Sequence, residues 1–425
     1  MIDQGKPMAS IGLTDGPFRQ SPNRLAVYVA AGQGPYANTR AVLARMDLSP
    51  ARGKRVLLKP NAGRVAPPRS GITTHPQVIA AAIDAFMEAG AEVAVGESPI
   101  VGVTALDAFD CMGVAQIARE RGCRLIDLDV HHFVEVRIPD GRAIKSLKVC
   151  PELLEYDIVV SVPVMKMHMH TGVTLAVKNM KGCLWRRSKV QLHMLPPVEG
   201  CDDKPIDIAI ADMSSVLRPH LAIIDGTVGM EGLGPSAGQA KPFDVIVAGA
   251  DAYAADSIAC RLMGTQAERI PHLRIGAGRG YGVIDPDAML VIPEDWRQWI
   301  SPFSPPPEHL SIEFPGITIL DKNSCSACQS TLLLFLKHYG DRLADYFPQD
   351  RGICIAIGKG HESLPEGTLC IGNCTVLHRD CGIFIPGCPP VSSQILTTLS
   401  GKPSVDRIDG HIEGQDTKKG APDGE

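Results

Sequence analysis

Aromatic residues are scarce in this sequence, in which Phe, Trp and Tyr together make up 5% of 425 residues. Nucleic-acid bases stack on aromatic side chains, so this scarcity argues against a surface that binds single strands. Basic residues are not in excess either, because 42 Lys and Arg stand against 47 Asp and Glu. The chain therefore lacks the basic footprint of a nucleic-acid-binding protein, and we expect no nucleic acid among its partners.

Long apolar runs are also missing. No segment approaches the roughly 18 apolar residues that cross a bilayer. The first twenty residues lack the basic and apolar regions of a secretory signal peptide. We therefore expect a cytoplasmic protein without a membrane segment. In that reducing compartment, the 13 cysteines of the chain favour metal binding over disulfides.

Hydrophobic residues make up 44% of the chain, which is enough for a large core and more than one domain. Strand-like and helix-like segments alternate over most of it. This alternation predicts an α/β fold with a doubly wound, mostly parallel sheet covered by helices on both faces. We expect strands at 25–30, 55–58, 91–96, 124–128, 158–162, 221–225 and 244–248. We expect helices at 39–45, 77–89, 105–121, 206–217 and 252–263, and a hairpin within 131–149.

Composition divides the chain into five parts. A segment near residue 300 is rich in proline, and the C-terminal residues are polar with few large apolar side chains. We predict a flexible lead at 1–24, an α/β domain at 25–283, a proline-rich linker at 284–315, a smaller cysteine-rich α/β domain that holds a metal or cluster at 316–400, and a disordered tail at 401–425.

The stretch from Asp157 to Gly182 changes character abruptly. A buried strand at 158–162 is followed by residues that we expect to form a loop rich in lysine, histidine and hydroxyl groups. Ligands of open α/β sheets bind beyond the carboxyl ends of the strands, and lysines at such a place suit an anion. A polar surface loop is the alternative interpretation. The candidate residues here are Lys166, His168, Thr174, Lys178 and Asn179.

Three further strand ends carry polar residues that we expect to converge on the same cleft. In one alternative interpretation Glu97 caps a helix, and in another Asp225 only shapes a turn. The glycines of the predicted loop at 226–238 either let backbone approach a ligand or permit tight turns. The candidate residues are Lys59, Asn61, His75, Glu97, Asp225 and Glu231.

Lysines and histidines suggest different roles in this cleft. Lys59, Lys166 and Lys178 would hold an anionic substrate or cofactor, and Lys166 is also a candidate catalytic residue. His168 or Glu97 would move protons. For His168 and His170, acid–base chemistry is favoured over metal binding.

Seven cysteines cluster between residues 325 and 388. A CxxC pair and two isolated cysteines supply the four thiolates that either a four-iron cluster or a zinc ion accepts. Zinc sites usually have two short-range pairs, whereas the third and fourth thiols here stand alone in glycine-rich loops. We therefore predict a 4Fe-4S iron–sulfur cluster, with zinc as the alternative. The predicted ligands are Cys325, Cys328, Cys374 and Cys388.

The remaining cysteines of this segment are assigned differently. Cys381 is a reserve ligand. Cys354 and Cys370 lie in apolar, strand-like runs, where a thiol behaves as a small hydrophobe. The GCPP turn around Cys388 resembles the cysteine turn of the proximal-cluster subunit of hydrogenases and of the quinone-reducing subunit of complex I.

Five spaced motifs resemble a known family, the domain of unknown function 362 family. They are KPN at 59–61, TTHP at 73–76, VGES at 95–98, VPVMKMH and TGVTLAVKNMKG at 162–168 and 171–182, and IIDGTVGMEGLGP at 223–235. The resemblance covers roughly residues 57–264. Many members of that family are associated with iron–sulfur centres, but it has no established reaction to transfer. A looser similarity of layout to the nickel-pincer lactate racemase family is an analogy only.

Three functional hypotheses follow. The leading one is an iron–sulfur enzyme, an oxidoreductase or a lyase, that acts on an anionic small molecule bound at the strand-end cleft. The second is an electron-transfer or scaffold protein without catalysis, which would need a redox partner protein. The third is an acid–base enzyme stapled by zinc. Metal content and a bound small molecule would distinguish them.

Overall fold

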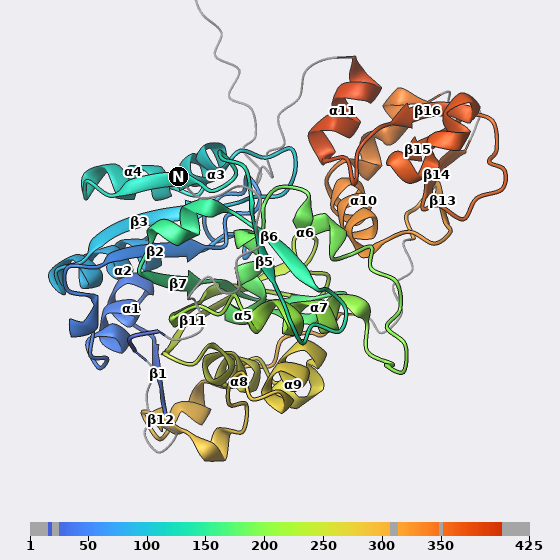
Figure 1. The fold of residues 1–425 in the computed structure, drawn as a ribbon. Helices are drawn as coiled ribbons and strands as arrows, with labels where there is room; N and C mark the ends of the chain where they lie inside the picture. The colour runs from blue at the N-terminus through green and yellow to red at the C-terminus, as the bar shows by residue number, and fades with distance from the viewer. Residues whose placement is uncertain (1–15, 19–24, 307–312, 348–351, 402–425) are drawn as a thin grey trace, which may run out of the picture.

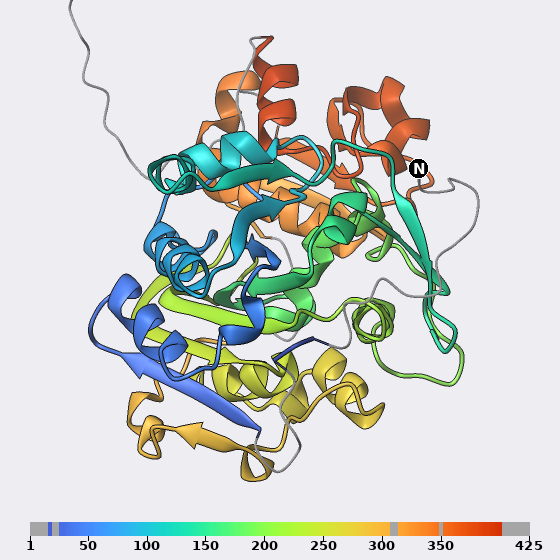
Figure 2. The same ribbon diagram turned by 60° about the vertical axis from the view of Figure 1, so that its left-hand side comes forward.

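The computed structural model describes residues 16–18, 25–306, 313–347 and 352–401. The predicted flexible lead and disordered tail therefore lie almost entirely outside the described residues. Figures 1 and 2 show a large body, drawn blue to yellow, and a smaller orange-red body formed by the C-terminal part. No helix within the described ranges combines the length and the apolar character that crossing a membrane requires.

The large body is built on one ten-stranded sheet with the order β12-β1-β11-β10-β7-β2-β3-β4, and β8 and β9 branch from β10. Its strands are β1 (Ala26–Ala31), β2 (Arg55–Pro60), β3 (Glu92–Glu97), β4 (Arg124–Asp127), β7 (Ile158–Val162), β8 (Val164–His168), β9 (Gly172–Thr174), β10 (Leu221–Glu231), β11 (Gln239–Gly249) and β12 (Leu290–Ile292). The path from β10 to β4 is parallel throughout, whereas β11 runs antiparallel to both of its neighbours. The predicted α/β fold with a mostly parallel sheet is confirmed.

Helices cover both faces of this sheet because alternate residues of each strand point to opposite sides. In β7, Ile158 and Val160 belong to one apolar cluster and Val159 to the other. The first cluster packs against α1 (Pro35–Leu43), α2 (Pro76–Glu88), α3 (Ala105–Cys111) and α4 (Val114–Glu120). The second packs against α5 (Ala176–Asn179), α7 (Pro205–Ser214), α8 (Ala252–Leu262) and α9 (Pro271–Gly278). The short helix α6 (Ser188–Gln191) follows α5.

Several local predictions need correction. The residues after β7 do not form a loop, because after Pro163 the chain resumes as β8, which pairs with β10 and β9. The predicted glycine loop at 226–238 is strand as far as Glu231. The helix expected at 105–121 breaks at Gly113, which has a φ of 81° that glycine tolerates best. The segment expected to be only turn-rich, 271–282, contains α9.

Residues 131–149 contain the predicted hairpin, formed by the antiparallel strands β5 (Val134–Arg137) and β6 (Ser146–Val149). The segment predicted to be a proline-rich linker does more than connect. It contributes β12, which extends the large sheet through parallel pairing with β1.

The small body has a parallel four-stranded sheet and an apolar cluster of its own. Its strands are β13 (Ile317–Asp321), β14 (Ile353–Ile357), β15 (Thr368–Ile371) and β16 (Gly382–Ile385), and its helices are α10 (Ser326–Tyr339) and α11 (Ser392–Ser400). Helix α10 also touches the large body. Its Lys337 Nζ donates to the carbonyl oxygens of Ala237 at 3.0 Å and Gly238 at 2.7 Å.

Helix α5 is held in place by a buried carboxylate. Asp256 of α8 accepts hydrogen bonds from the backbone N–H groups of Ala176 at 2.7 Å and Val177 at 3.0 Å, one on each carboxylate oxygen. These groups lie at the start of α5 and have no partner within so short a helix. Burial raises the pKa of Asp256 to about 8. Asp256 thereby fixes the segment that carries Lys178 and Asn179.

We expect Asp256→Asn to destabilise the protein by about 1–3 kcal/mol, because the amide group cannot accept from both N–H groups and turns a donor toward one of them. Urea unfolding at pH 9, where Asp256 is ionised in the folded protein, followed by circular dichroism measures this change. Asp202→Asn, at an exposed position, is the matched control and should leave the midpoint unchanged. Equal stability of the two variants would contradict this role of Asp256.

Candidate functional site

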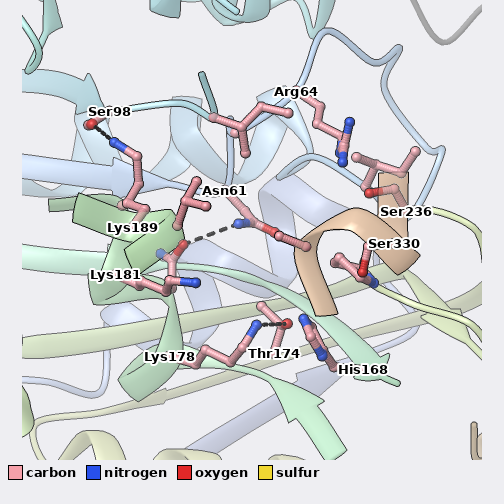
Figure 3. A pocket seen from close by; sticks show the side chains of 18 of the residues that line it. Asn61, Arg64, Ser98, His168, Thr174, Lys178, Lys181, Lys189, Ser236 and Ser330 are labelled. Atoms are coloured by element: carbon pink, nitrogen blue, oxygen red, sulfur yellow. Dashed lines mark hydrogen bonds between the residues drawn. The ribbon is translucent and has the colours of Figure 1, made fainter. Parts of the chain in front are cut away.

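A cavity of about 210 Å³ lies between the strand ends of the large sheet and helix α10. Figure 3 shows side chains from both bodies turned toward it, with Lys178, Thr174 and His168 along one edge and Ser330 of α10 at another. We call it the cationic cavity. The predicted residues that line it are Lys59, Asn61, Glu97, Lys166, His168, Thr174, Lys178 and Asn179.

Three predicted residues do not line this cavity. Asp225 is buried below it and accepts hydrogen bonds from the backbone N–H groups of His75 at 2.7 Å and Thr227 at 2.9 Å. Asp225 therefore shapes the turns of the backbone. His75 caps α2 by accepting from the N–H of Gln77. Glu231 accepts from the Ser304 N–H at 3.0 Å, away from the cavity wall.

The cavity wall also contains residues that the sequence did not single out. From the large body these are Arg64, Ser98, Lys181, Lys189, His193 and Ser236. From the small body they are Ala327, Ser330, Thr331, Pro389 and Val391. Lys181 was within reach of the motif-based prediction, since it follows Lys178 and Asn179 in the same polar stretch. Helix α10 contributes Ala327, Ser330 and Thr331 to the wall only because the two bodies pack together, and no local sequence pattern predicts that packing.

A buried ion pair anchors the floor of the cavity. Lys59 Nζ lies 2.9 Å from Glu97 Oε2 and 3.0 Å from Asn179 Oδ1, and all three side chains are buried. Glu97 also accepts from the backbone N–H groups of Ala62 and Ser98, both at 3.0 Å. Burial raises the pKa of Glu97, while the Lys59 charge opposes that rise. The Glu97 carboxylate is therefore fully used in binding Lys59 and the two backbone N–H groups.

Glycine is required beside this pair. A Cβ atom on Gly182 would lie 2.2 Å from Glu97 Oε1 and 2.6 Å from Lys59 Nζ. Contacts that short do not occur, so a side chain at this position would push the ion pair apart. The glycine of the NMKG motif therefore belongs to the construction of the site.

Three other lysines face the cavity without a carboxylate partner in its described wall. Lys166 Nζ donates to the carbonyl oxygens of Ile72 at 2.8 Å and Pro235 at 3.4 Å. Lys178 Nζ donates to Thr174 Oγ1 at 3.1 Å, and Lys181 bonds to His193 Nε2. Burial lowers the pKa of all three, to about 7 for Lys178 and well below the ordinary value for Lys166 and Lys181.

The fifth lysine of the cavity wall, Lys189, is paired. Lys189 donates to Ser98 Oγ and to the Leu184 carbonyl at 2.8 Å, and it lies 3.5 Å from the Asp129 carboxylate. Burial nevertheless lowers its pKa. Lys59 and Lys189 are therefore neutralised within the protein, in contrast to the other three.

Two histidines in the wall are neutral. Burial, followed by the charge of Lys178, holds the pKa of His168 well below its usual range. The Nδ1 atom of His168 accepts from the His170 backbone N–H at 3.2 Å, so the proton of this ring lies on Nε2. His193 links the two bodies, because its Nδ1 lies 2.5 Å from Ser326 Oγ at the start of α10.

The four cysteines predicted to bind a cluster gather beside the cavity. The neighbouring Cys328 thiol, by hydrogen bonding, lowers the pKa of Cys325 to about 6. The pKa of Cys328 is raised by that bond, then by burial, and then by the nearby Cys374 and Cys388 sulfurs. Cys328 precedes the wall residue Ser330 by two positions, and Cys388 directly precedes the wall residue Pro389.

A second group of thiols lies apart from these four. Burial raises the pKa of Cys370 to about 11, and the nearby Cys381 and Cys354 add to that rise. Cys381, the reserve ligand, therefore lies near Cys354 and Cys370, the two cysteines on strands. In the described part of the chain, no set of three or more His, Cys, Asp or Glu side chains is positioned to hold a single metal ion.

A curated protein with a similar sequence is the "Thylakoid-associated protein sll1697" of Synechocystis sp. (strain ATCC 27184 / PCC 6803 / Kazusa), which is 28% identical over 224 residues. The match covers 52% of this chain and 66% of the relative, slightly less than two thirds of its length.

Two solved structures are similar in part. A crystal structure of a Thermotoga maritima protein gives a TM-score of 0.35 at 15% identity, with 55% of this chain and 60% of that chain covered. The lactate racemase apoprotein from Thermoanaerobacterium thermosaccharolyticum gives 0.37 at 11% identity, with 80% and 70% covered. Likeness at this level carries no conclusion about activity.

The family model described as Domain of unknown function (DUF362) matches residues 56–261. This range contains the strands and turns that carry the cavity lysines, and it ends before the cysteines of the small body. Over residues 56–261, just under half of its length, the chain is therefore similar to the family described as Domain of unknown function (DUF362).

Proposed function

We propose that this protein is an iron–sulfur enzyme that binds an anionic small molecule in the cationic cavity. One observation carries the proposal. Lys166 and Lys178 are buried and Lys181 is half-buried in a wall whose one carboxylate among the described residues, Glu97, is already paired with Lys59. Taking an ammonium group out of water costs several kcal/mol unless a counter-charge is present. A bound anion supplies that counter-charge.

The cavity suits a small ligand with polar and apolar parts. Its wall includes apolar side chains such as Ile72, Ile100 and Val391 beside the lysines. Asn61 Oδ1 is buried without a hydrogen-bond partner among the described atoms, so it offers an acceptor to a ligand hydroxyl or amide. A few convergent polar groups on an apolar wall are typical of small-molecule sites.

The residues present fit a four-thiolate cluster. Cys325, Cys328, Cys374 and Cys388 are close enough to affect one another's charge, which is what a shared cofactor requires. A Cβ atom on Gly372 would be in van der Waals contact with the Cys328 sulfur at 3.6 Å, so this glycine lies directly beside that thiol. These four cysteines would hold the cluster, which when bound would supply one-electron chemistry or a Lewis-acidic iron.

The arrangement favours a cluster over zinc and an enzyme over an electron carrier. Four thiolates around a cluster each bind a different iron, so they are spaced more widely than those around one zinc ion. In the sequence, the third and fourth thiols stand alone instead of forming a second short-range pair, which supports the cluster. An electron carrier needs no enclosed cavity lined with lysines, whereas an enzyme for an anionic substrate does.

We expect anion binding to take up protons and to weaken as the pH rises above 7. The free protein holds Lys178 with a pKa of about 7 and Lys166 and Lys181 lower still. A bound anion favours the ammonium forms and raises these pKa values. Affinity is then highest below pH 7 and falls by up to about tenfold per pH unit for each proton taken up.

Calorimetric titration with malonate and with inorganic phosphate, in buffers of different ionisation enthalpy, measures both effects. Lys166→Met should weaken binding at pH 6 by about tenfold or more, or about 1.4 kcal/mol. Lys54→Met, at an exposed position, is the control and should bind like the wild type. Failure of both anions to bind, or affinity that does not change with pH, would count against the anion site.

We expect anaerobically purified protein to carry iron and sulfide and to absorb broadly near about 400 nm through thiolate-to-iron charge transfer. Cys388→Ser should lose the cluster because it removes a direct ligand. Cys354→Ser is the matched control. Cys354 lies in β14, near Cys370 and Cys381, and is not one of the four predicted ligands. Retention of full iron by Cys388→Ser and its loss from Cys354→Ser would overturn the ligand assignment. Zinc at one atom per chain without iron would remove the redox centre.

A further inference from the structure

Lys178 differs from the other lysines of the cationic cavity in how little its amine is engaged. Lys166 donates to two carbonyl oxygens, which fix the direction of its Nζ and use two of its protons. Lys59 is bound to Glu97, Asn179 and the Pro60 carbonyl. Among the described residues, Lys178 Nζ donates one hydrogen bond, to the Thr174 hydroxyl at 3.1 Å. The rest of its amine faces the cavity (Figure 3).

The surroundings of Lys178 leave about half of its amine in the neutral, nucleophilic form at pH 7. Its side chain is buried, and no carboxylate bonds to it among the described residues. Burial lowers its pKa to about 7, and the charge of Asp207 offsets that decrease only in part. An exposed lysine, with a pKa of about 10.4, is almost entirely protonated at neutral pH and cannot attack a carbonyl.

The groups around Lys178 provide a place for a carboxylate. Lys166 pairs across the strands with Thr174, the hydrogen-bond partner of Lys178, so the two lysines lie at the same part of the wall. The positive charge of Lys178 lowers the pKa of both Lys166 and Lys181, which shows that all three amines are close. An anion held by Lys166 and Lys181 would therefore present its neighbouring atoms to Lys178.

We propose that Lys178 is a nucleophile that forms an imine with the carbonyl carbon of a small oxo acid whose carboxylate lies between Lys166 and Lys181. This inference rests on the proposed anion site and goes beyond it by naming the substrate class and a covalent step. Neither the family description nor the iron–sulfur chemistry assigns such a role to this residue.

The covalent step balances without an added oxidant or reductant. The Lys178 nitrogen forms a bond to the carbonyl carbon, and the C=O π electrons move to oxygen, which takes a proton while the nitrogen loses one. The Thr174 hydroxyl, already bonded to the amine, can pass that proton. The carbinolamine hydroxyl then takes the remaining proton of the nitrogen, the C–O bond breaks, the nitrogen lone pair forms the C=N bond, and water leaves. Hydrolysis reverses the sequence.

Reductive trapping tests the proposal on the full-length protein. Incubation with pyruvate and sodium cyanoborohydride at pH 7 should add one reduced pyruvate per chain, detected by intact mass and located at Lys178 by peptide mapping. Malonate, which has two carboxylates and no ketone, should suppress the adduct. Lys178→Arg should abolish it, and Lys54→Arg should retain it. Because Lys178→Arg keeps the positive charge, its circular dichroism and urea midpoint should match the wild type, which shows that the variant is folded.

The outcomes separate this inference from the proposed function. Malonate binding without an adduct at Lys178 would overturn the imine while leaving the anion site in place. An adduct spread over exposed lysines, or one that persists in Lys178→Arg, would overturn it as well. Failure of malonate, phosphate and pyruvate alike would remove both the anion site and the imine. A single adduct at Lys178 that malonate suppresses supports both.

Discussion

The buried pair of Lys59 and Glu97 is the interaction on which the cavity depends. Lys59 is the last but one residue of β2 and Glu97 is the last residue of β3, so the pair joins two neighbouring strands at their carboxyl ends. Asn179 completes it by accepting from Lys59 Nζ and donating to the Lys59 carbonyl and to Ser161. In this way the pair ties α5 to the sheet. Gly182 passes so close that only hydrogen fits at its α-carbon.

The lysines of the cavity have two different roles, depending on whether a carboxylate lies nearby. Lys59 and Lys189 have carboxylates nearby and support the structure. Lys166, Lys178 and Lys181 have none bonded to them in the described wall, and burial lowers the pKa of each. A protein gains no stability from burying three ammonium groups in this way. Such an arrangement is expected where a ligand rather than the fold provides the counter-charge.

The two bodies meet where their chemistry is concentrated. Helix α10 begins directly after Cys325, contacts His193 through Ser326 and His170 through Ser330, and lines the cavity with Ser330 and Thr331. The same helix thus carries Cys328, one of the predicted cluster ligands, and part of the wall of the cationic cavity. Any cofactor held by the four cysteines would lie next to a ligand in the cavity, which explains why the two features occur in one chain.

The sequence by itself determined the α/β class, the strands from β2 to β7, and the lysines and amides that follow those strands. Alternating apolar residues fix which face of a strand is buried, and the parallel order brings strand ends to one edge. Spacing also predicted Cys325, Cys328, Cys374 and Cys388 as a group, and their sulfurs lie near one another in the fold.

Only the tertiary structure decided that residues 164–168 form a strand, because pairing with β10 overrides their polar composition. It also decided that Asp225 points to a turn, that Lys181 and His193 enter the wall, and that α10 closes it. Those outcomes depend on contacts between segments far apart in sequence, and no local pattern records such contacts.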